Sequence, residues 1–72
     1  MHHADIIAEL KKADYPAIKL ANDLGVSRGY VSLIIHNKRR SKRVAKTIAA
    51  AINRDINVIW PGVYDDVNKE AA

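Results

Sequence analysis

The 72 residues of this sequence are enough for one compact domain and too few for two. The chain contains no cysteine, which excludes disulfide scaffolds and thiolate metal sites. Its apolar runs are far shorter than the ~20 residues of a membrane span, and no signal peptide is visible. Twelve Lys and Arg against 8 Asp and Glu give a formal charge of +4. We expect a cytoplasmic protein.

The first two predicted helices lie on either side of a proline. Apolar residues recur at helical spacing over residues 4–13, which predicts the first helix. Asp14-Tyr15-Pro16 ends it, because a residue that precedes proline avoids the helical conformation. Proline fits the first position of a second helix, predicted over residues 16–24. The residues of that helix expected in the core are Ile18, Leu20, Ala21 and Leu24.

Capping residues indicate where the later helices begin. Ser27 can cap a third helix over residues 28–37, after Gly25 has ended the second in the left-handed conformation. Ser41 can cap a fourth helix over residues 42–53, and Asp55 can cap a last turn over residues 56–60. The residues of these helices expected in the core are Val31, Ile34, Ile35, Val44, Ile48 and Ile52, with Ala45, Ala49, Ala50 and Ala51 as small fillers.

The predicted fold class is therefore all-α, a compact bundle of four helices with a short C-terminal helical turn. Trp60 and Ile59 are expected to seal its core. This predicted domain covers residues 1–64, and the polar residues 65–72 are expected to form a disordered tail.

The connection between the second and third helices contains the strongest functional signal. A helix-turn-helix needs a small residue where its helices cross, a glycine at the turn, and apolar residues that face the core. Ala21, Gly25, Val26, Val31 and Ile34 fill these positions. An ordinary helical hairpin could share parts of the pattern. The basic segment that follows favours binding of duplex DNA through the major groove.

The outward face of the third helix would then read the bases. Arg28 can pair with the N7 and O6 of guanine, and Ser32 can bond to a base or a phosphate. Gly29 could let the helix backbone approach the groove closely, although glycine inside a helix costs ~1 kcal/mol relative to alanine. Leu33 has two open interpretations, which are contact with thymine methyl groups and packing in the core.

The segment after this helix is basic at every position from Lys38 to Arg43 except Ser41. Such a run can be a solvated surface, or it can contact the sugar-phosphate backbone without reading sequence. For Tyr30, and likewise for Tyr15, the alternative to a phosphate contact is packing at the edge of the core. The expected phosphate contacts are Tyr30, His36, Asn37, Lys38, Arg39, Arg40, Lys42 and Arg43.

We expect no enzyme and no cofactor. The sequence has no nucleophile elbow, no phosphate-binding glycine loop and no convergent carboxylate pair. His2, His3 and His36 do not suggest a metal site, because the first two are expected in a mobile terminus and no cysteine completes a ligand set.

Three segments show a family resemblance: His3-Ala4-Asp5-Ile6-Ile7-Ala8, Leu24-Gly25-Val26-Ser27, and Ile59-Trp60-Pro61 with Tyr64. On the strength of these segments, residues 1–64 resemble the Ner family of regulators from Mu-like transposable phages and their bacterial Nlp-type relatives. These proteins belong to the lambda-repressor-like helix-turn-helix group. The relatives tend to have prolines in the loop after the recognition helix, where this chain has Lys38-Arg39-Arg40-Ser41. The resemblance implies base contacts by Arg28, Gly29, Ser32 and Leu33, with Ser27, Lys38 and Arg39 near phosphates.

The function implied by the resemblance is repression of early phage or prophage transcription through operator occupancy, by two protomers on neighbouring half-sites. We expect double-stranded DNA as the partner, a homodimer that forms on DNA, and a location at the nucleoid when bound. We expect no membrane partner and no small-molecule substrate. The alternatives are a small helical adaptor, whose basic loop meets an acidic protein, and an architectural DNA binder of low specificity.

Overall fold

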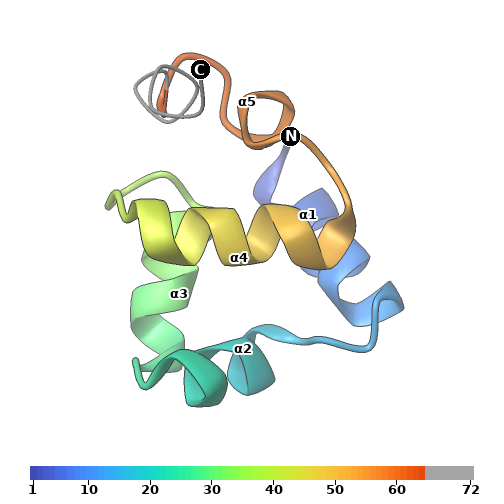
Figure 1. The fold of residues 1–72 in the computed structure, drawn as a ribbon, viewed down its shortest axis with the longest axis vertical. Coiled ribbons are helices and arrows are strands. Elements are labelled where there is room, and N and C mark those ends of the chain that lie inside the picture. The colour runs from blue at the N-terminus through green and yellow to red at the C-terminus, as the bar shows by residue number, and fades with distance from the viewer. Residues whose placement is uncertain (65–72) are drawn as a thin grey trace.

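The computed structural model describes residues 1–64, which form five helices and no strand (Figure 1). Every helix begins and ends within two residues of its predicted bounds, so the predicted all-α class is confirmed. No helix in this part of the chain is long and apolar enough to cross a membrane. The predicted tail lies outside the described residues. The helices are α1 (His3–Lys12), α2 (Ala17–Leu24), α3 (Arg28–Ile35), α4 (Lys42–Ile52) and α5 (Ile56–Ile59).

The capping residues account for this agreement. Side-chain oxygens of Ser27, Ser41 and Asp55 accept a backbone N–H of the first turn of α3, α4 and α5, at 3.0, 3.3 and 2.8 Å. Gly25 ends α2 with a φ of 71°, as predicted. The cap of α1 was not predicted: the Nδ1 of His2 accepts the N–H of Ala4 at 3.1 Å.

Helix α3 ends two residues earlier than predicted. His36 is its C-cap, and Asn37 adopts a left-handed φ of 58°, which asparagine tolerates better than most residues. The backbone N–H groups of Lys38 and Arg39 then donate to the carbonyl of Leu33, at 2.9 and 3.3 Å. The start of the basic segment is therefore folded against the end of α3.

Side chains from all five helices meet in one core, which α5 and the following turn close from one side. The Trp60 side chain is 3% exposed, packs edge-on against the ring of Tyr64 at 5.6 Å, and donates its indole N–H to the carbonyl of Ile35 at 3.5 Å. The prediction that Ile59 and Trp60 seal the core is confirmed. The other most buried side chains are Ile6, Leu10, Leu20, Val31, Ile34, Val44 and Ile48.

Ile18 was predicted to lie in the core, and this prediction is wrong, because Ile18 is 50% exposed. Successive helical residues turn by about 100° around the axis. The buried side of α2 is centred on Ala17, Leu20, Ala21 and Leu24, so Ile18 lies at its margin. Ala50, expected as a small filler, is exposed as well. α2 therefore carries an apolar side chain on the surface beside α3.

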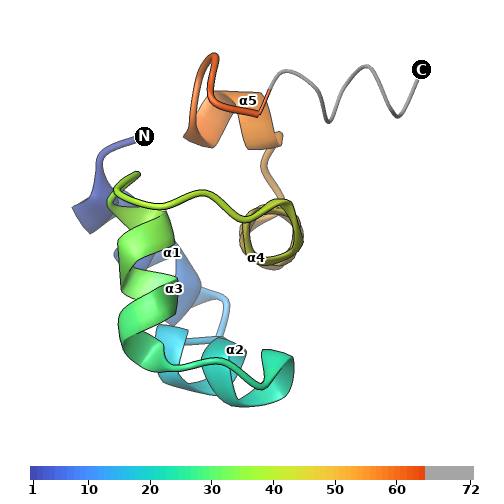
Figure 2. The same ribbon diagram turned by 90° about the vertical axis from the view of Figure 1, so that its left-hand side faces the viewer.

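Helix α3 presents one side to solvent along its whole length. In Figure 2 it lies in front of α1, while α2 crosses below it and α4 is seen end on. The segment after α3 runs from its upper end to the start of α4. One face of the molecule therefore brings together α3, the basic segment and the first turn of α4.

Candidate nucleic-acid interface

The exposed side of α3 is the side that the sequence predicts to be outward. Its core-facing residues Val31, Ile34 and Ile35 are all buried. Leu33 is 41% exposed, so the core-packing interpretation of this residue is wrong. A row of exposed residues thus runs along α3 and its C-cap, consisting of Arg28, Gly29, Ser32, Leu33 and His36.

No contact inside the protein requires a glycine at position 29. A Cβ built at Gly29 would meet only the Oγ of Ser27, at an ordinary 3.9 Å. Gly29 is also helical, so no left-handed backbone explains it. A glycine that lowers helix stability without an internal reason is compatible with a partner that approaches the backbone from outside.

Replacing Gly29 with alanine is therefore expected to have opposite effects on folding and on DNA binding. The free protein should gain up to about 1 kcal/mol of stability, which raises the melting temperature of so small a domain by about 4–8 °C. Affinity for duplex DNA should fall, because the added methyl group holds the helix away from the groove. Thermal unfolding and a binding titration test the two signs, and a stabilised variant with undiminished affinity would remove the close-approach explanation.

The side chains of the basic segment, residues 38–43, have different surroundings in the structure. Lys38, Arg39 and Arg40 are exposed, and the Arg39 guanidinium lies over the half-buried ring of Tyr30 at 5.3 Å from its centroid. Arg43 instead donates to the carbonyl of Leu24, at 2.9 Å, and so ties α4 to the end of α2. In this arrangement Arg43 supports the geometry of the helix-turn-helix.

Tyr15 also has a structural partner. Its hydroxyl donates to the carboxylate of Asp23 at 2.7 Å, across the ends of α2. This hydrogen bond is the main cause that raises the pKa of Tyr15 above its ordinary value of 10.0. Partial desolvation and the negative charge of Asp23 add to the rise. The packing and hydrogen bonding of Tyr15 therefore favour a structural role over a phosphate contact.

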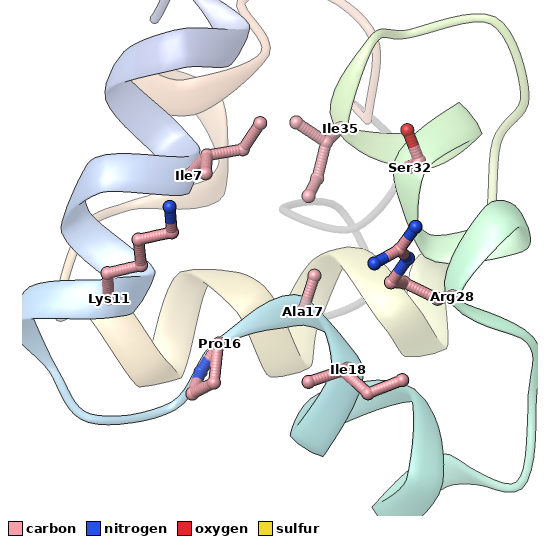
Figure 3. Close-up of a pocket in the computed structure, with 8 residues that line it drawn as sticks. All are labelled: Ile7, Lys11, Pro16, Ala17, Ile18, Arg28, Ser32 and Ile35. Carbon is pink, nitrogen blue, oxygen red and sulfur yellow. The ribbon is translucent and has the colours of Figure 1, made fainter.

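A groove of about 360 Å³ lies beside the exposed row, between α1, α2 and α3 (Figure 3). Ile7, Ala17 and Ile18 give it apolar walls, and Lys11 and Arg28 lie on its opposite sides. Lys11 and Ile18 were not predicted as site residues. The helical spacing of Ile7 and Lys11 places them on one face of α1, but only the packing of α1 against α3 brings that face to the site.

The three histidines of the chain form a cluster that was not expected. His2 and His3 were predicted to lie in a mobile terminus, but the ring of His3 packs against the other two. Its centroid lies 4.1 Å from that of the His2 ring and 4.2 Å from that of the His36 ring. We call this cluster the histidine stack. Among residues 1–64, no group of three or more His, Asp or Glu side chains is arranged to hold a metal ion.

Comparison with known families agrees with a DNA-binding role for the chain. A model of the winged helix-turn-helix DNA-binding family matches residues 1–72. Searches of the curated proteins and of the solved structures found no match. Residues 1–64 contain no strand, so the described part of the chain has the helix-turn-helix without a β-wing. Because the match covers the whole length, the chain belongs to the winged helix-turn-helix DNA-binding family.

Proposed function

We propose that the protein is a sequence-specific regulator of the Ner-like type, which represses early transcription of a phage or prophage by occupying an operator. The observation that supports this most is the exposed row on α3, with the basic segment directly after it. A duplex-binding family and a local excess of positive charge agree with a polyanionic partner.

In the proposed complex, α3 lies in the major groove, which is about 12 Å wide and admits one helix. Arg28, at the first position of α3, reads guanine, while Ser32 and Leu33 read bases one turn further along. Ser27, Tyr30 and the basic segment contact the sugar-phosphate backbone, which fixes the register of α3 without adding sequence information.

We infer that two protomers pair on neighbouring half-sites and that the free protein is a monomer. The exposed large apolar side chains of the described residues are Ile18, Leu33 and Val58, on three different helices. A stable dimer interface needs a more extended apolar surface than single side chains provide. Sedimentation of the protein with one-site and two-site duplexes distinguishes pairing on DNA from a dimer that exists beforehand.

The deciding experiment is selection of bound duplexes from a random pool at near-physiological salt, followed by sequencing. A motif of two half-sites about 34–36 Å apart, one helical turn, would support the regulator and supply its operator. Enrichment without a motif would favour the architectural binder. Absence of binding to any duplex would favour the adaptor and contradict the proposal.

Neutralising the basic segment should change the salt dependence of binding. We expect each of Lys38→Ala, Arg39→Ala and Arg40→Ala to weaken binding to all duplexes similarly. Each should reduce the slope of log K against log salt by about 0.9, the value for one lost phosphate contact. Titrations at several salt concentrations measure the slope. A slope that stays at the wild-type value would mean that these side chains are only solvated.

A further inference from the structure

The histidine stack lies at the end of α3 where the basic segment begins. His36 is the C-cap of α3, two positions before Lys38, and it continues the exposed row of Arg28 and Ser32 at intervals of four residues. His3 connects this point to the start of α1 by packing on the His36 ring at an interplanar angle of 29°. The stack is therefore placed to meet the same polyanion as the basic segment.

The hydrogen bonds define which ring nitrogens can take up a proton. The Nδ1 of His36 lies 2.8 Å from the carbonyl oxygen of Ser32, and a carbonyl only accepts, so Nδ1 bears a hydrogen. The Nε2 of this exposed ring is then the atom that gains or loses a proton. The Nδ1 of His2 accepts the N–H of Ala4, so His2 can cap α1 only while this nitrogen is unprotonated.

The hollow beside the histidine stack has no acidic residue in its lining. This hollow, of about 310 Å³, is lined from the start of α1 by Met1, His2 and His3, and from the end of α3 by His36 and Asn37. The Met1 ammonium donates to the carbonyl of Ile59 at 2.8 Å. The turn after α5 contributes Trp60, Pro61 and Val63, none of which titrates. None of the residues lining this hollow is a carboxylate. Met1 also lines a second hollow, in which the carboxylates are Asp5 and Glu9.

Protonation of the free stack is opposed by its own geometry. Loss of water around the stacked ring lowers the pKa of His3 below its ordinary value of 6.5, and the charges of His2 and His36 lower it further. In the free protein the packing of His3 therefore contributes stability above pH 6.5. This stability is lost as the pH falls through the lowered pKa of His3. An anion beside the rings would offset the repulsion and favour the charged form.

We propose that the histidine stack is a proton-linked site for a DNA backbone phosphate, in which the Nε2 of His36 donates to a phosphate oxygen. This inference rests on the proposed function and adds a regulation to it. A proton enters the stack as DNA binds, so affinity increases as the pH falls. Because the contact is to phosphate, the same increase occurs on operator and on random duplex.

The size of the effect follows from linkage. Uptake of one proton changes affinity by at most tenfold per pH unit, and imidazole titrates around pH 6.5. Between about pH 8 and about pH 6 we expect the affinity of the whole chain for a random duplex to rise about five- to tenfold at constant ionic strength. All three histidines of the chain belong to the stack.

The test compares wild type with two variants at position 36 in phosphate-free buffers. His36→Gln removes the charge and should bind with low affinity that is nearly independent of pH. His36→Lys fixes the charge and should bind at pH 8 about as tightly as wild type does at pH 6. Calorimetry in two buffers of different ionisation enthalpy should show proton uptake by the wild type that is lost in both variants.

The outcomes separate this inference from the proposed function. If wild type binds duplex DNA with an affinity that does not change with pH, the inference fails and the function stands. If His36→Gln follows the wild-type pH curve, a group other than His36 takes up the proton and the inference fails. Absence of duplex binding at every pH contradicts both. Recovery of pH-independent affinity in His36→Lys supports the inference, since a purely structural role for the ring would not produce it.

Discussion

Replacing Arg28 with alanine is expected to weaken binding to the selected operator by about 1–3 kcal/mol, or about 5- to 150-fold, while binding to random duplex stays nearly unchanged. Arg28 is exposed at the first position of α3, where a guanidinium can form two bonds to the edge of a guanine. The change leaves the proposed phosphate contacts of the basic segment intact. Competition between operator and random duplexes measures the specificity ratio directly.

Arg54→Ala is the matched control for this experiment. It removes the same charge from the chain, but Arg54 follows the C-terminal end of α4 and pairs weakly with Glu9 at 3.8 Å. Its side chain is 48% exposed, so the pair adds little to stability. We expect Arg54→Ala to change operator and random binding by the same small factor. An Arg28→Ala variant that loses affinity equally on both duplexes would contradict base reading by Arg28.

Replacing Trp60 with alanine is expected to have the largest effect on stability, about 3–5 kcal/mol. The indole is almost fully buried among α3, α5 and the following turn, and its ring packs on Tyr64. Since small domains have little stability to lose, this variant should be largely unfolded near 37 °C. Because Trp60 is the one tryptophan of the chain, urea unfolding should be followed by circular dichroism instead of fluorescence.

Val58→Ala is the control within the same helix. Val58 is 54% exposed, so its truncation should change the free energy of unfolding by less than about 0.5 kcal/mol. If both variants lost the same free energy of unfolding, the loss would come from a weakened α5 helix, and the indole would not seal the core.

The helices could be predicted from the sequence because their ends depend on local chemistry. Ser27, Ser41 and Asp55 cap through hydrogen bonds to residues two or three positions away, and Gly25 adopts its conformation without any tertiary partner. The outward face of α3 followed from the same local periodicity, since burial of Val31, Ile34 and Ile35 leaves only one side free.

The contacts that could not be predicted join residues far apart in the sequence. The packing of His3 on His36 and the bond from Arg43 to the Leu24 carbonyl depend on how whole helices cross. No spacing rule connects those positions. Ile18 was misplaced for a related reason, because periodicity gives the direction of a buried stripe but not its width, and the width is set by the neighbouring helices.

The shortness of α2 and α3 has a consequence for how such a protein can acquire a new target. Each of these helices has eight residues, whereas isolated helices shorter than about 12–15 residues are marginal in water. A peptide of the two helices, cut out and grafted elsewhere, should not keep its shape. New specificity is therefore accessible mainly by exchanging exposed side chains on an intact domain, so that a lineage of such proteins can diverge in target while its core stays the same.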